Sequence, residues 1–146
     1  MKKIATILAV VLAVIIVVLL GLLIFVKPVQ GPTISRAENL QVDLPQPNAV
    51  VSSPVAIEGS VTGGGWFFEG SFPVKVLSGD GKVIGTGTAQ ALSDWTSTGT
   101  VPFSASVLFT APSSSYGVTG TILFANDNPS GLPGSAKSFS VPIRFK

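Results

Sequence analysis

From Leu40 to the C-terminus, apolar and polar residues alternate in short segments that are separated by turn residues. The alternation is clearest in VAIEGSV (55–61), FPVKV (72–76), FSASVLF (103–109) and FSVPIRF (139–145). A period of two places successive side chains on opposite faces of a β-strand, so each segment predicts a strand with one buried face. Short strands spaced by turns, without helical periodicity, are typical of an all-β sandwich.

Two further strand features can be predicted from residue types. The segment GTILFA (120–125) is almost continuously apolar, which favours a central strand with both neighbours present. Pro142 lies within the last alternating segment and cannot donate a ladder hydrogen bond. We therefore expect the last strand to lie at a sheet edge, or to turn that position outward.

A hairpin is predicted at Ser78-Gly79-Asp80-Gly81, between VKVL and KVIG. A type I turn whose last glycine is left-handed would close it. The register that keeps the apolar face continuous places Val76 opposite Ile84 and Val74 opposite Thr86.

Residues 4–26 carry no charge, no Asn, no Gln and no Pro. As a helix this run would be about 35 Å long, enough to cross a hydrocarbon core of about 30 Å. A buried core helix would show polar residues at 3.6-residue spacing, and none is present. We therefore predict a single transmembrane helix ahead of the β domain.

Two interpretations of this helix compete. A cleaved secretory signal has an apolar region of about 7 to 15 residues followed by small residues at the cut site. The present run is longer and ends in LLIFVKPVQGP, without an A-x-A pattern, and the chain has no Cys for lipoprotein processing. We favour an uncleaved signal-anchor in a bacterial cytoplasmic membrane. Because Lys2 and Lys3 precede the run and only Lys27 follows closely, residues 1–3 are expected in the cytoplasm and the rest outside.

The remaining chain divides into a linker and one domain. Residues 27–39 mix Pro, Gly and polar residues without periodicity, as a linker does, and residues 40–146 form the predicted domain. That domain has five basic and six acidic residues, so it lacks the basic footprint of a nucleic-acid-binding protein. The absence of Cys argues against a disulfide scaffold and fits a bacterial cell-envelope protein.

The composition also limits enzymatic chemistry. With no His and no Cys, Ser-His-Asp triads, Cys-His pairs and His-ligated zinc are excluded. A paired-carboxylate hydrolase could use Glu69 with Asp94 or Asp127, but isolated loop acids are usually solvated. Asp80 and the Asp127-Asn128 pair lack the spacing of a calcium loop. We therefore expect neither an enzyme nor a bound metal or cofactor.

The segment WFFEGSFPVKV (66–76) allows two interpretations of its aromatic residues. Alternation through Phe72 turns Trp66 and Phe68 inward, unless a bulge at the glycine interrupts it. We favour a core position for Phe68. For Trp66 and Trp95, which both adjoin Gly/Ser/Thr-rich segments, a lid over the core and a binding anchor remain alternatives.

A candidate binding end follows from these aromatic residues and the loop NDNPSG (126–131). Asx, Pro and Gly residues are also what a tight loop requires, so this loop has an explanation without a ligand. The candidate binding residues are Trp66, Glu69, Trp95, Asn126, Asp127, Asn128 and Ser130.

Five segments in order carry a family resemblance: VVSSPVAIEGSV, WFFEGSFPVKVLSGDGKVIG, VPFSASVLF, DNPSG and FSVPIRF. Over about residues 42–146 the chain resembles the bacterial immunoglobulin-like domain found beside GerMN domains in spore-germination and sporulation proteins. The resemblance implies a seven-strand-type antiparallel sandwich outside the membrane, with a binding role. It implies no chemistry, because the family offers no catalytic residues to carry over. Here an anchor and a linker precede the domain instead of a GerMN domain.

We thus expect a membrane-anchored, non-catalytic envelope protein whose immunoglobulin-like domain contacts other proteins or the cell wall. A glycan-binding module or glycan-directed hydrolase, built on Glu69 and the tryptophans, is one alternative. A purely structural spacer is another.

Overall fold

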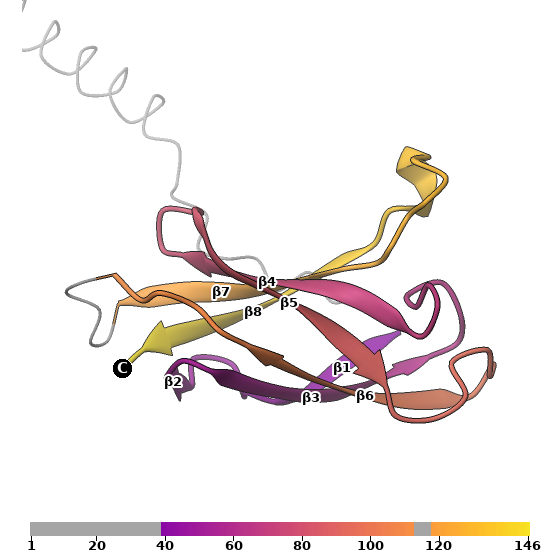
Figure 1. Ribbon diagram of the computed structural model, residues 1–146, viewed down its shortest axis with the longest axis horizontal. Coiled ribbons are helices and arrows are strands. Elements are labelled where there is room, and N and C mark those ends of the chain that lie inside the picture. Colours follow the sequence, from indigo (N-terminus) through magenta and orange to yellow (C-terminus); the bar gives the residue numbers. More distant parts are fainter. Residues whose placement is uncertain (1–38, 113–117) are drawn as a thin grey trace, which may run out of the picture. The chain divides into compact units, whose positions relative to one another are not determined.

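The computed structural model describes residues 39–112 and 118–146, and these residues form an all-β domain (Figure 1). One short 3-10 turn, η1 (Pro133–Ser135), is the single helical element among them. The strands are β1 (Leu40–Leu44), β2 (Val50–Val51), β3 (Val55–Thr62), β4 (Ser71–Ser78), β5 (Val83–Ala91), β6 (Thr100–Val107), β7 (Thr119–Ala125) and β8 (Ser138–Phe145).

The strands form one sheet that curls into two layers, in the order β1-β3-β6-β5-β4-β7-β8-β2. Strands β1, β3 and β6 lie in one layer, and β4, β7 and β8 lie in the other (Figure 1). Strand β5 pairs with β4 along most of its length and with β6 at its end, so it joins the layers. The predicted all-β class is confirmed, and the curled sheet is consistent with an immunoglobulin-like sandwich. Instead of the expected seven strands there are eight, including the two-residue β2.

The buried faces of the strands are those that the alternation predicts. In β3, β4 and β8 every second residue is buried, and β6 follows the same pattern at most positions. Strand β7 lies between β4 and β8, as a nearly continuous apolar run suggests. Its neighbour β8 is not an edge strand, because the short β2 pairs with it at Arg144 and Phe145, and the N–H of Asn48 donates to the carbonyl of Pro142 at 2.7 Å. Pro142 lies on the face of β8 opposite to the buried Val141 and Ile143, which is the second of the two predicted positions.

The β4–β5 hairpin turn has the predicted form, but its predicted register is wrong. Gly81 has a φ of 82°, and its N–H donates to the carbonyl of Ser78 at 2.9 Å. Val76, however, pairs with Gly85 and not with Ile84, because the ladder shifts by one residue before Leu77. By the same shift the partner of Val74 is Gly87 and not Thr86.

The physical reason for this register is the close approach of β6, and of the residues that follow it, to β5. A Cβ atom on Gly85 would lie 2.6 Å from the Cβ of Phe109, and one on Gly87 would lie 2.8 Å from a methyl of Val107. Only glycine fits at these inward positions of β5. Aligning apolar side chains across the hairpin therefore predicts the wrong partner.

Among residues 39–112 and 118–146, no helix is long and apolar enough to cross a membrane. The predicted transmembrane helix (4–26), the short N-terminus (1–3) and nearly all of the predicted linker (27–39) lie outside the described residues.

Candidate functional site

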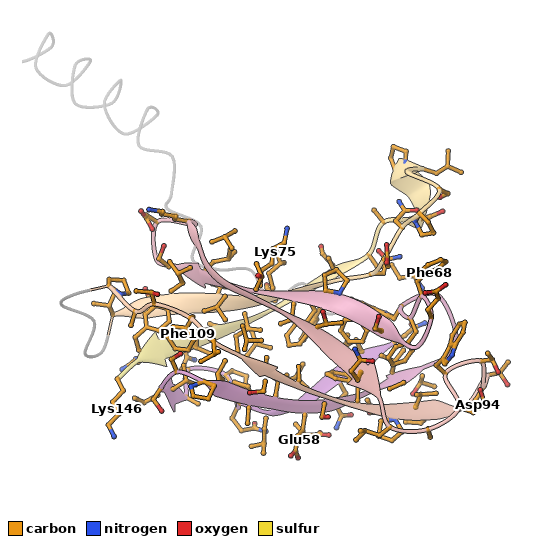
Figure 2. All side chains as sticks on the ribbon, viewed as in Figure 1. Glu58, Phe68, Lys75, Asp94, Phe109 and Lys146 are labelled. Carbon is orange, nitrogen blue, oxygen red and sulfur yellow. The ribbon has the colours of Figure 1, made fainter. Side chains whose placement is uncertain are left out.

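Three loops meet at one end of the sandwich, which we call the loop end. They are residues 63–70 between β3 and β4, residues 92–99 between β5 and β6, and residues 126–137 between β7 and β8. The first two are joined by a hydrogen bond of 3.2 Å from the N–H of Gly63 to the carbonyl of Gly99. Figure 2 shows Phe68 and Asp94 at this end, and Phe109 and Lys146 at the other.

Trp66 lies inside the domain beneath the loop end. Its side chain is 0% exposed, and its ring meets Phe72 edge-on with centroids 5.6 Å apart. Phe72 in turn contacts Phe103 at 5.1 Å, so the indole begins a row of aromatic rings through the core. The indole Nε1 is buried without a hydrogen-bond partner. Of the two alternatives for Trp66, the structure therefore gives the core position.

The neighbouring phenylalanines do not follow the predicted alternation. Phe67 is partly buried with its ring 5.2 Å from Phe72, whereas Phe68 is 43% exposed, so the predicted core position of Phe68 is wrong. The cause is a tight turn. Phe68 and Ser71 exchange backbone hydrogen bonds of 2.9 and 3.1 Å, and both Glu69 (φ 50°) and Gly70 (φ 77°) are left-handed. The chain reverses directly after Phe68, so the alternation of inward and outward side chains does not continue through the turn.

Trp95 lies on the surface, against this turn. Its side chain is 41% exposed, and a Cβ atom on Gly70 would lie 3.2 Å from the indole Cδ1. The indole thus packs over the glycine while part of its ring stays in solvent. Glu69, on the same turn, is exposed. The structure therefore brings Trp95, Phe68 and the Glu69 turn together at the surface.

A side-chain cap fixes the backbone beside Trp95. The Asp94 carboxylate accepts hydrogen bonds from the Thr96 hydroxyl at 2.7 Å and the Thr96 N–H at 3.0 Å. These bonds, the hydroxyl first, hold the pKa of Asp94 below its ordinary value. The carboxylate therefore stays ionised at neutral pH.

Asn126 ties the third loop to the first. Its Nδ2 donates to the carbonyls of Gly65 at 3.1 Å and Ser135 at 2.8 Å, and its Oδ1 accepts from the N–H of Lys137 at 2.7 Å. The side chain of Asn126 is therefore occupied in building the loop.

Further along the same loop, Asn128 donates to the carbonyl of Leu132 at 2.9 Å and accepts from the Ser130 hydroxyl at 2.7 Å. These bonds shape the loop as its Asx-Pro-Gly composition suggests. Asp127, which lies between Asn126 and Asn128 in the sequence, is exposed.

Exposed aliphatic residues extend the loop end beyond the residues singled out from the sequence. Leu92 is 62% exposed and Leu132 is 61% exposed. Neither could be recognised from a pattern, because each lies in a polar loop without periodicity. Within the described part of the chain, no three acidic residues gather in a way that would hold a metal ion.

A comparison with protein families gives one match. A family model described as Gmad2, the immunoglobulin-like domain of bacterial spore germination, matches residues 39–131. Neither the curated proteins nor the solved structures include a significant match.

Proposed function

The chain belongs to the family of immunoglobulin-like domains of bacterial spore germination, and from this premise we propose that it is a membrane-anchored, non-catalytic interaction protein of the cell envelope. In this proposal residues 4–26 hold the chain in the membrane, and the exported domain contacts other envelope proteins or the cell wall. Fold alone does not assign a function, so the proposal depends on the surface of the domain.

The observation that carries the proposal is the exposed indole of Trp95 beside Phe68 and Glu69. Indole side chains are frequent anchors of binding surfaces, since they offer a large rigid area and one polar atom. Loops at the end of a sandwich accept such residues without disturbing the core. Trp66 then has a supporting role beneath the loops, not a direct contact with the partner.

The glycan-directed alternatives receive less support. With Trp66 in the core, a platform of two indoles is not available, and Trp95 would act with Glu69 alone. The carboxylate of Asp94 is engaged by the hydroxyl and N–H of Thr96, so it already has a role in shaping its own turn.

The anchoring is tested by fractionating cells that express the full chain. We expect mass spectrometry to find the N-terminal peptide in the membrane fraction, and external protease to release the domain from spheroplasts. A soluble protein that begins near residues 29–32 would instead show a cleaved signal and contradict the anchor.

The interaction role is tested on purified residues 40–146, which contain every strand of the domain. We expect no turnover of peptidoglycan or soluble glycans, and saturable retention on isolated cell envelope. Turnover would support the hydrolase, and saturable binding to soluble glycan would support the glycan module. A domain that shows no turnover, no binding and no retention would be a spacer, which contradicts the proposal.

A further inference from the structure

The path of the chain determines which end of the domain lies nearest to any preceding segment. The N–H of Thr62 donates to the carbonyl of Asn39 at 2.8 Å, and Leu40 pairs with Val61 in the sheet. Since Thr62 leads directly into residues 63–70, the chain joins the domain at the loop end. The C-terminal Lys146 lies at the opposite end (Figure 2).

A short connection keeps this end near the membrane, if residues 4–26 are the anchor of the proposed function. Residues 27–39 can span about 40 Å when fully extended, and a flexible chain of this length has a mean end-to-end distance of roughly 20 Å. The loop end would therefore stay within reach of the headgroups. Docking would need no loss of conformational entropy other than that of residues 27–39.

The apolar side chains of the loop end have the composition of a membrane-interface surface. Phe68 and Trp95 are the large aromatic residues exposed in the described part of the chain, and both lie here with Leu92 and Leu132. Aromatic rings, and indoles above all, prefer the headgroup region of a bilayer. The opposite end exposes aliphatic residues instead, such as Leu108 and Val50.

The charges of the loop end select among lipids. Glu69, Asp94 and Asp127 are exposed, while Lys137 is partly buried and donates to the carbonyl of Gly64 at 3.2 Å. Three carboxylates against one ammonium are repelled by anionic headgroups, so this charge balance favours a zwitterionic lipid surface over an anionic one.

We propose that the loop end docks on the zwitterionic lipid surface of the membrane that anchors the chain, with Phe68 and Trp95 at headgroup depth. This inference rests on the proposed anchor, and it gives the same candidate site a lipid partner in place of the protein or wall partner named above. Docking would hold the domain against the bilayer and direct its opposite end, with β2 and Lys146, away from the membrane.

The test uses the full chain reconstituted in vesicles of phosphatidylcholine and phosphatidylethanolamine that contain lipids brominated in their acyl chains. Bromine quenches nearby indoles, and Trp66 and Trp95 are the only tryptophans. We expect quenching in the wild type and its loss in Trp95→Phe, which leaves only the buried Trp66.

Phe68→Ser should weaken the quenching at least about twofold, whereas the matched control Leu108→Ser, at the other end, should not change it. Replacing half of the zwitterionic lipid by phosphatidylglycerol should also reduce it.

Vesicle flotation separates the two proposals. One outcome is that the chain floats with the vesicles while the brominated lipid does not quench Trp95. If acrylamide in the water then quenches Trp95 as strongly as it does in isolated residues 40–146, the docking is refuted and the anchor stands. That result would leave the loop end to a protein or wall partner. If the chain does not float, the anchor of the proposed function is refuted, and the docking with it. Quenching that grows with phosphatidylglycerol would contradict the role assigned to the carboxylates.

Discussion

The two tryptophans of the domain lie at the same end of the sandwich, yet one is fully buried and the other is 41% exposed. Both adjoin Gly/Ser/Thr-rich segments, so their local compositions do not separate them. The difference arises from what lies beneath each ring. The ring of Trp66 packs against Phe72 in the aromatic row of the core, whereas the ring of Trp95 packs over the backbone of Gly70 on the facing turn. The same residue type thus stabilises the fold at one position and is available for binding at the other.

Trp66→Ala should have the largest effect on stability. Removing a large, fully buried ring costs roughly 3 to 5 kcal/mol, from lost transfer free energy and from the cavity left behind. Denaturant unfolding of residues 40–146 would measure the loss, and Phe103→Ala, in the same row, should cost about as much. A loss below about 1 kcal/mol would show that Trp66 is not a core residue.

Gly70→Ala should have an intermediate effect and would disturb the support of Trp95. Gly70 has a φ of 77°, and the added Cβ would lie 3.2 Å from the indole. Both factors are unfavourable, so we expect a loss of about 1 to 2 kcal/mol in thermal or denaturant unfolding. Gly134→Ala is the matched control, because it has no positive φ and a Cβ there would meet nothing within 4 Å. Equal effects of the two variants would contradict the tight packing of the turn against Trp95.

Acidification should reveal the smallest effect, at the turn beside Trp95. The pKa of Asp94 is lowered from 3.8, chiefly by the Thr96 hydroxyl, so its contribution to stability is present above 3.8. It is lost as the pH falls through the lower pKa of the folded state. The stability advantage of the wild type over Asp94→Asn should therefore be present at pH 7 and shrink progressively as the pH is lowered below 3.8. An advantage that persists at low pH would mean that the Thr96 hydrogen bonds do not favour the ionised form.

Much of the fold follows from the sequence because strand alternation encodes which side chains enter the core. The inward positions of β3, β4 and β8 were predictable in this way. The partner of Val76 was not, because it depends on the close approach of Gly85 to Phe109, which follows β6 and lies outside the hairpin. Alternation predicts which face of a strand is buried. It does not predict how closely other segments approach that face, and this approach decides which residues pair.

The candidate site was predictable only in part, for a related reason. The loop composition indicated the end of the sandwich where Glu69 and Trp95 meet, but not which aromatic residues lie outside. Phe68 is exposed because Glu69 and Gly70 reverse the chain with two left-handed residues. A left-handed Glu is uncommon, so its sequence gives little warning of the turn.

In the proposed division of roles Trp95 contacts the partner while Trp66 stabilises the core, and Trp95→Ala separates the two roles. For this variant, thermal stability and retention on isolated cell envelope would be measured together, with Leu108→Ala as the control at the opposite end. We predict that Trp95→Ala loses retention while its melting temperature stays within a few degrees of the wild type, and that Leu108→Ala changes neither. The opposite result is a large drop in melting temperature, with a loss of retention that the unfolded fraction fully explains. That result would show that Trp95 stabilises the fold and does not bind a partner.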